Sequence, residues 1–152
     1  MSHIEVVHLF EKPEHLPTVA GWIYEEWWTG KPGYSPQGIE KKLWEASDPT
    51  RIPLSLLATV DGKPAGTVNL IESDDEERPH LRPWLAALLV RPEFQNRGIG
   101  AVLVHRCVEE AKRLGIEHLY LGTRIPDYYR KLGAEIREQA GTGFWIMRLR
   151  AE

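Results

Sequence analysis

Apolar and polar residues alternate along the chain with periods that predict strands and helices in turn. Residues 4–9, Ile-Glu-Val-Val-His-Leu, read as a first strand. Pro13 then begins a predicted helix whose apolar residues recur at helical spacing: Leu16, Val19, Ala20, Ile23 and Trp27. The segment 30–33, Gly-Lys-Pro-Gly, ends this helix because glycine and proline both disfavour its continuation.

A second helix is predicted directly after that break. Ser35 suits the N-cap position and Pro36 the first helical turn. Ile39, Leu43 and Trp44 then give the helix an apolar face that we expect to be buried. Three tryptophans are expected in the core because of their apolar neighbours: Trp22, Trp44 and Trp145.

The middle of the chain predicts a hairpin followed by a buried strand. Residues 53–60 and 63–71 read as two strands joined at Asp61-Gly62, a dipeptide suited to a tight hairpin turn. Residues 72–79 form an acidic loop, which most simply is solvated. The apolar run 85–90 then reads as a buried strand.

The remaining elements complete one mixed sheet. A long amphipathic helix is predicted over 98–114 and ends at Gly115. Its charged residues are expected to face water: Arg106, Glu109, Glu110, Lys112 and Arg113. A strand at 118–121, a short helix at 127–132 and strands around Ile136 and at 144–149 follow. This order predicts an α+β domain with about seven strands.

Composition narrows the class of protein. A chain of 152 residues is expected to form a single domain, residues 1–152. The net charge of −3 argues against a general nucleic-acid binder. The single cysteine excludes an intramolecular disulfide and a cysteine-rich metal site, so no metal is expected. Because no apolar run approaches the length of a membrane span and no signal peptide is visible, we expect a cytoplasmic protein.

The most informative segment lies between the strand 85–90 and the long helix. The strand ends at Arg91-Pro92, a short polar turn follows, and Gly98 and Gly100 stand at the beginning of the helix. Such a turn leaves unpaired backbone N–H groups at the positive end of a helix dipole, which favours a phosphate. The dinucleotide fingerprint fails because position 103 is Leu, and the nucleoside-triphosphate loop fails because no Gly-Lys-Ser/Thr is present.

The spacing that does match is Gln-x-x-Gly-x-Gly/Ala over residues 95–101. With Leu-x-Val-x-Pro at 88–92 and Tyr-x-Lys-x-Gly at 129–133, the chain resembles the GNAT family of N-acetyltransferases over nearly its whole length. The resemblance implies a central twisted mixed sheet of about seven strands, with helices on both faces. It also implies acetyl-CoA as the cofactor.

The resemblance assigns the cofactor-binding residues and two catalytic groups. Binding of acetyl-CoA would fall to Leu88, Leu89, Val90, Gln95, Asn96, Arg97, Gly98, Ile99, Gly100 and Ala101. The Leu88 N–H is expected to stabilise the oxyanion. Tyr129 is expected to be the general acid that protonates the thiolate, with its neighbour Tyr128 as the alternative.

The general base stays open at this stage. Some family members place a glutamate on the cofactor strand where this chain has Trp84. Glu26, His80 or an ordered water are the alternatives, and Glu26 ranks first because the first helix borders the acceptor site in the family. Position 134 is Ala where the family usually has an aromatic residue, which either enlarges the pocket or alters core packing.

The acceptor site is expected to be lined by aromatic residues. Trp27, Trp28 and Trp84 are candidates, with Trp27 first, and His80 is a further substrate-binding candidate. If the acidic run at residues 72–77 leans over the entrance, it would favour a cationic amine by electrostatic steering.

These features predict an acetyl-CoA-dependent N-acetyltransferase that acts on a primary amine of a small molecule, peptide or protein by direct transfer. The alternative is a GNAT-fold module that binds or senses acyl-CoA without turnover, which the missing strand glutamate keeps open. The expected partner is the amine acceptor, without nucleic acid or membrane. Whether the chain forms a homodimer is left open.

Overall fold

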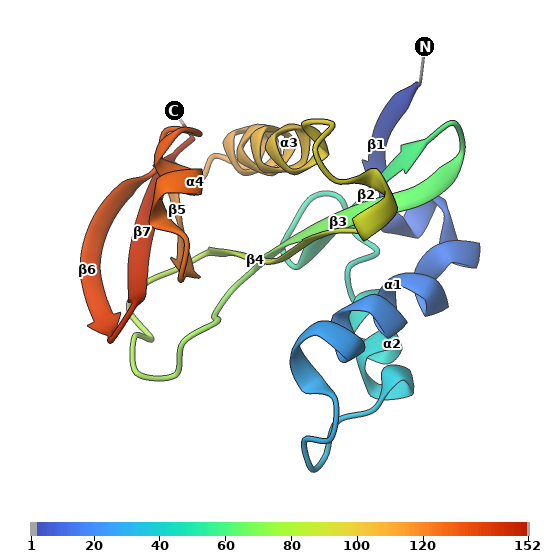
Figure 1. Ribbon diagram of the computed structural model, residues 1–152, viewed down its shortest axis with the longest axis horizontal. Coiled ribbons are helices and arrows are strands. Elements are labelled where there is room, and N and C mark those ends of the chain that lie inside the picture. Colours follow the sequence, from blue (N-terminus) through green and yellow to red (C-terminus); the bar gives the residue numbers. More distant parts are fainter. Residues whose placement is uncertain (1–2, 152) are drawn as a thin grey trace.

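One seven-stranded mixed sheet runs through the protein, and helices cover both of its faces (Figure 1). The computed structural model describes residues 3–151. The strands are β1 (Ile4–His8), β2 (Leu54–Val60), β3 (Lys63–Ile71), β4 (Trp84–Val90), β5 (His118–Thr123), β6 (Glu135–Gly141) and β7 (Phe144–Arg150). The helices are α1 (Leu16–Ile23), α2 (Pro36–Trp44), α3 (Ile99–Arg113) and α4 (Pro126–Arg130), with short helical turns η1 (Leu9–Glu11), η2 (Pro13–His15), η3 (Tyr24–Trp28) and η4 (Pro92–Phe94). No helix within residues 3–151 is long and apolar enough to cross a membrane.

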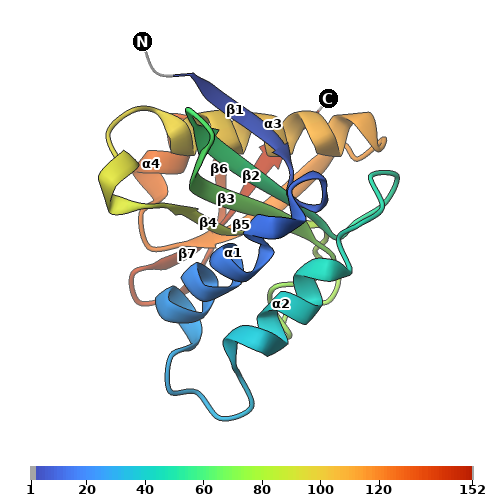
Figure 2. The same ribbon diagram turned by 90° about the vertical axis from the view of Figure 1, so that its right-hand side faces the viewer.

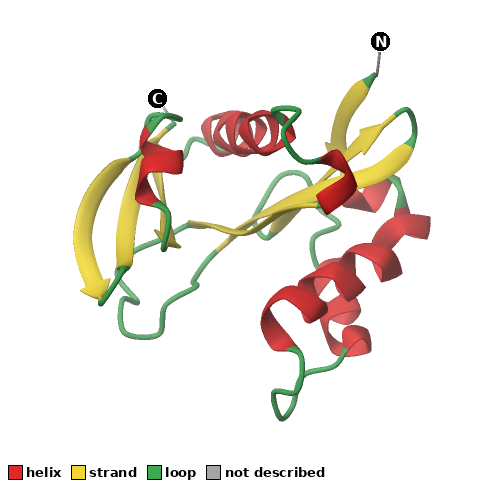
Figure 3. Cartoon of the chain, in the orientation of Figure 1, coloured by secondary structure: helices red, strands yellow, loops and turns green. Residues whose placement is uncertain are grey.

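The strand order is β1-β2-β3-β4-β5-β7-β6, and every neighbouring pair is antiparallel except β4 and β5. That parallel contact is limited to Trp84 opposite Tyr120. Beyond this pair the two strands diverge, so β5, β6 and β7 stand apart from β1 to β4 at one end of the sheet (Figure 3). The predicted mixed α+β sheet is confirmed, and its parallel seam is very short.

Two cores lie on opposite faces of the sheet. In β2 the alternate residues point to opposite sides: Leu56 packs in the cluster that contains α3, and Leu57 in the cluster with α1 and α2. Figures 1 and 2 show α1 and α2 side by side below the sheet and α3 above it. Because both faces are covered, all seven residues of β2 are buried.

Local sequence signals act as expected at three boundaries. Asp61 and Gly62 both adopt positive φ angles, 50° and 84°, which a tight hairpin turn between twisted strands requires. The Ser35 hydroxyl accepts a hydrogen bond from the Gly38 N–H at 3.0 Å and so caps α2. The first helix continues through Trp27, but after Ile23 it widens into the π-helical turn η3.

Two expectations about burial are wrong. Trp44 is 50 % exposed because it is the last residue of α2, whose contact with the sheet is made by Ile39 and Leu43. Glu110 does not face water: it is 6 % exposed. The helical period alone could not indicate the partners that its carboxylate finds on β1 and along α3.

The Glu110 carboxylate joins α3 to the first strand. It lies 2.6 Å from His8 Nε2 and 2.9 Å from Arg113 Nη2. Arg106, 3.8 Å from the same carboxylate, also donates to the Val6 carbonyl oxygen at 2.9 Å. Burial raises the pKa of Glu110, but the hydrogen bond from Arg113 and the charges of His8 and the arginines outweigh it and hold the pKa below its ordinary value.

We expect Glu110→Gln to lower the free energy of unfolding by about 1–2 kcal/mol, because the buried carboxylate is lost while its arginine partners, Arg106 and Arg113, keep access to solvent. A carboxyl whose folded pKa is depressed stabilises above its unfolded pKa of about 4.3, and this contribution disappears as the pH falls through the folded value. The difference in the free energy of unfolding between wild type and variant should therefore become smaller at acid pH. Urea unfolding at several pH values measures this, with the exposed Glu109→Gln as control. Equal stability of the two variants would contradict it.

Candidate active site

A bulge in β4 turns its backbone toward a cavity. Ala87 has a φ of 51°, a left-handed conformation that is uncommon for a residue other than glycine. The register with β3 jumps from Leu89 opposite Thr67 to Ala86 opposite Asn69, which leaves Ala87 and Leu88 opposite a single residue. Because β5 has already diverged, the register gives Leu88 no partner on either neighbouring strand. Its peptide group is thus placed to meet a ligand.

The glycine turn follows β4 directly and leads into α3. The Gln95 side-chain amide donates to the Val90 carbonyl oxygen at 3.0 Å, which closes the turn. Asn96 and Gly98 adopt positive φ angles of 64° and 79°, and residues 95–98 are exposed. No side chain caps α3 at Gly98. The first N–H groups of α3 therefore stay available for an anion, as the sequence predicts.

Two adjacent tyrosines of α4 approach this region from the far side of the opening. Tyr129 is 9 % exposed, and burial together with Tyr128 raises the pKa of its phenol to about 12. Tyr128 is 38 % exposed, and its ring stands at 88° to that of Tyr129. The Tyr128 hydroxyl lies over Gly100, where an added β-carbon would collide with it. The absence of a side chain at Gly100 thus accommodates Tyr128, a neighbour that the sequence did not reveal.

A cavity of about 560 Å³ connects these parts. One side is formed by Ala87 and Leu88 of β4, Gly122 of β5 and Tyr129 of α4. The other side is formed by η3, α2 and the segment after β3. The bulged backbone and the Tyr129 side chain thus line one cavity.

The cavity contains only some of the predicted acceptor-side residues. Trp27 and Trp28 line it, since the π-helical turn brings both into its wall. Glu26 and His80 are exposed and lie outside the lining. Trp84 also lies outside it: the side chain is 1 % exposed, packs with Tyr120 and donates its indole N–H to the Leu81 carbonyl oxygen at 2.7 Å. An acceptor-contacting role for Glu26, His80 or Trp84 has no support from these positions.

Three polar residues that sequence reasoning did not single out line the same cavity. Asp74 lies at its rim, and partial burial together with the Asp75 charge raises the pKa of its carboxyl to about 6. On the floor, the Ser55 hydroxyl donates to Asn69 Oδ1 at 2.6 Å. The acidic run at residues 72–77 drew attention to this segment, but the sequence did not indicate which of its carboxylates lines the cavity. The Ser55–Asn69 pair depends on strand register and had no local signal.

Comparison with known proteins agrees with this architecture. Residues 20–134 match the model of the acetyltransferase (GNAT) family. An uncharacterised N-acetyltransferase of Methanocaldococcus jannaschii is 35 % identical over 88 residues, which cover 52 % of this chain but only 38 % of that protein.

Solved structures are similar over the whole chain. A GNAT-family acetyltransferase of Streptococcus pneumoniae has a TM-score of 0.70 at 20 % identity and 99 % coverage of both chains. The yncA protein of Salmonella typhimurium, solved with its cofactor acetyl-CoA, reaches 0.73 at 13 % identity, covering 100 % of this chain and 95 % of its own. The paia N-acetyltransferase of Thermoplasma acidophilum, in complex with coenzyme A, has 0.62 at 23 % identity, covering 97 % and 99 %. The chain shares the fold of these proteins. Because residues 20–134 match the family model, the chain belongs to the GNAT acetyltransferase family.

Proposed function

We propose that this protein is an acetyl-CoA-dependent N-acetyltransferase that acetylates a primary amine by direct transfer. The observation that carries this proposal is the bulge at Ala87, which turns the Leu88 peptide group into the cavity that also contains Tyr129. The uncapped N-terminus of α3 follows on the same chain segment. Structural neighbours that carry acetyl-CoA or coenzyme A support the choice of cofactor.

The residues present fit this cofactor. The exposed glycine turn offers backbone N–H groups to a pyrophosphate, and the unpaired end of β4 offers peptide groups to the pantetheine amides. The residues that would hold it are Leu88, Leu89, Val90, Gln95, Asn96, Arg97, Gly98, Ile99, Gly100 and Ala101. Gln95 contributes by shaping the turn through its bond to Val90. Acetyl-CoA supplies the acetyl group as a thioester.

Two groups of this chain then assist the transfer. The Leu88 N–H donates a hydrogen bond to the carbonyl oxygen as negative charge develops there. Tyr129 gives its phenolic proton to the departing sulfur. Solvent water takes the proton that the amine nitrogen loses as the amide forms, and it returns a proton to the Tyr129 phenolate. With a pKa of about 12 the phenol stays protonated at neutral pH, so it is ready as an acid.

The position of the only cysteine supports direct transfer. Cys107 lies on α3, is 1 % exposed in the core and does not line the cavity. Burial raises the pKa of its thiol to about 12, so it is neither accessible nor ionised as a nucleophile needs to be. A cysteine-bound acetyl intermediate therefore has no support, which favours attack of the amine on the thioester itself.

The proposal is tested by release of coenzyme A thiol from acetyl-CoA across a library of primary amines. Amine-dependent thiol release, with the acetylated amine found by mass spectrometry, would support an N-acetyltransferase. Tight binding of acetyl-CoA without release for any amine would instead identify an acyl-CoA-binding module.

Tyr129→Phe keeps the ring and removes one hydroxyl. We expect kcat to fall by roughly 10²-fold, within the range of general acid catalysis, while acetyl-CoA affinity is unchanged. Tyr128→Phe serves as the matched variant and should lose much less, since its hydroxyl lies over Gly100. Steady-state kinetics with any accepted amine measure both. A larger loss in Tyr128→Phe would transfer the role to that residue.

Gly100→Val should weaken coenzyme A binding for two reasons, which a second substitution at Tyr128 separates. The added side chain collides with the Tyr128 hydroxyl, and it is larger than the Gly or Ala that the motif allows at the approach to the first turn of α3. In a Tyr128→Ala background the collision is absent, so thermal stability should return while coenzyme A affinity stays at least about tenfold reduced. Calorimetry with coenzyme A measures this, with Gly21→Ala, where a β-carbon meets nothing within 4 Å, as control. Full affinity in the double variant would remove Gly100 from the binding site.

A further inference from the structure

We infer that the cavity contains a subsite for the acceptor, in which Asp74 binds the ammonium group and Asn69 binds a neighbouring uncharged oxygen. The acceptor class is then a primary amine whose skeleton also carries a hydroxyl or carbonyl oxygen. This inference rests on the proposed function, because it names the molecule that the cavity admits opposite the cofactor.

Asp74 is a carboxylate of the cavity with no internal counter-ion. It lies at the rim, in the loop between β3 and β4. Among residues 3–151 no cation lies within ion-pair distance of it, whereas the adjacent Asp75 is bound by Arg78 at 2.8 Å. Asp74 itself is exposed, so a cationic ligand seated in the cavity would both supply the missing counter-charge and exclude water from the pair, which strengthens an ion pair.

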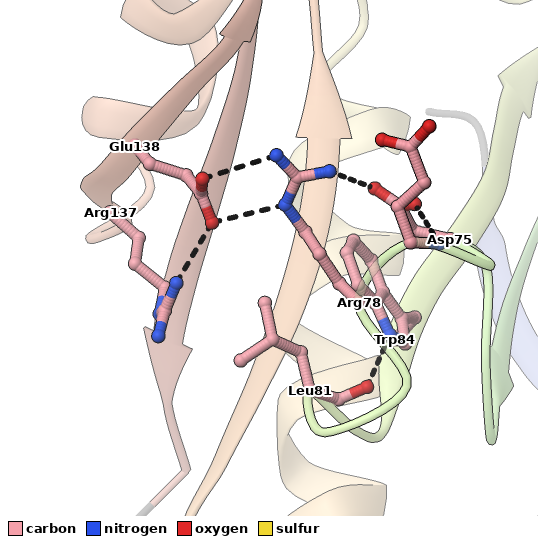
Figure 4. A network of polar contacts seen from close by, with 7 residues as sticks. Asp75, Arg78, Leu81, Trp84, Arg137 and Glu138 are labelled. Atoms are coloured by element: carbon pink, nitrogen blue, oxygen red, sulfur yellow. Dashed lines mark hydrogen bonds and ion pairs between the residues drawn. The ribbon is translucent and has the colours of Figure 1, made fainter.

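The loop that carries Asp74 is held by side-chain hydrogen bonds of Arg78 and of Trp84. Arg78 donates from Nε and Nη2 to the two oxygens of Glu138 on β6, at 3.0 and 3.1 Å, and from Nη1 to Asp75 (Figure 4). The Leu81 carbonyl oxygen accepts the Trp84 indole N–H in the same view. A bidentate arginine–carboxylate pair fixes orientation as well as distance. Asp74 is exposed, but the loop that carries it is anchored to β6 through Arg78, which fixes where its backbone lies.

Asn69 supplies an independent indication of a ligand. Its side chain is buried at 6 % exposure and lines the cavity floor. Its Oδ1 accepts from Ser55, but Nδ2 has no hydrogen-bond partner among the described residues. A buried amide donor without a partner costs free energy, and a rotation of the side chain that brings Nδ2 to an oxygen of the ligand would relieve that cost.

The charge state of Asp74 gives the subsite a defined pH dependence. Burial and the Asp75 charge raise its pKa to about 6, so the carboxylate is fully charged only above that value. The other charged or titratable side chains that line the cavity are Lys31, Tyr34, Lys42, Glu45 and Tyr129. Lys31 stands 5.0 Å from the centre of the Trp28 ring. Amine binding should therefore weaken as the pH falls through about 6.

The test is a calorimetric titration of the protein saturated with coenzyme A, which allows binding without transfer. Three probes share one skeleton: 2-amino-1-phenylethanol, 1-phenyl-1,2-ethanediol and 2-phenylethylamine. The amino alcohol should bind about tenfold more tightly than the diol, and this preference should disappear in Asp74→Asn. The amino alcohol should also bind more tightly than 2-phenylethylamine, and this difference in affinity should disappear in Asn69→Leu.

Glu45→Gln is the matched control, because it removes the other carboxylate of the same cavity. It should leave all three affinities unchanged. The subsite is wrong if the amino alcohol binds no more tightly than the diol, or if its preference survives in Asp74→Asn or is lost in Glu45→Gln. Because no transfer is needed, an absence of thiol release with every amine would overturn the proposed function without deciding the subsite.

Arg78 is a positioning residue, and Arg78→Gln tests that role separately. Loss of its charge leaves Asp75 unneutralised beside Asp74, so the pH midpoint of amine binding should move upward from about 6. A merely structural role would lower stability without moving this midpoint. Arg82→Gln is the control, since Arg82 on the same loop forms only an exposed pair with Glu72 at 3.9 Å. An unmoved midpoint in Arg78→Gln would overturn the assignment of Arg78.

Discussion

The short parallel contact between β4 and β5 is the constraint on which the site depends. A strand inside a sheet normally satisfies its backbone groups on both sides. Here β4 is paired with β5 only at Trp84, and the bulge at Ala87 interrupts its pairing with β3 as well. The second half of β4 accordingly changes from buried to half-buried. Its peptide groups are the ones that we propose to bind the cofactor. Most of the proposed cofactor contacts are therefore made by backbone, with side chains free to serve packing.

The proposed acceptor side differs, because it is built from side chains of η3, β2, β3 and the loop after β3. Trp27 and Trp28 enter from the π-helical turn, Ser55 and Asn69 from paired strands, and Asp74 from the loop after β3. A backbone-lined cofactor site tolerates sequence divergence, whereas this wall changes with every substitution. The family can thus share one fold at low identity and still differ in the acceptors that its members recognise.

The sequence predicted the features that depend on residues close together in the chain, and it missed those that depend on residues far apart. The Asp61-Gly62 turn, the Ser35 cap and the glycine turn are local, so each was visible within a few residues. The pairing of Ser55 with Asn69 is different: a two-residue turn with regular register would place Ser55 opposite Val68. A bulge at Ala65, between the pairs of Ala58 and Thr59, shifts that register by one residue. The burial of Glu110 was missed for the same reason, since His8 is distant in sequence.

The ion pair between Arg78 and Glu138 has a mechanical consequence. The half-sheet β1 to β4 and the half-sheet β5 to β7 are joined by little backbone bonding, and α3 packs across both of them on one face (Figure 1). Arg78 connects the β3–β4 loop to β6, away from α3. The two half-sheets are therefore held together at two places, by α3 and by the pair of Arg78 and Glu138. The width of the opening between them is then set by side chains more than by the sheet. In the reaction proposed above, the thickness of the acyl group that fits between the half-sheets would then depend on the partly buried pair of Arg78 and Glu138, outside the cavity itself.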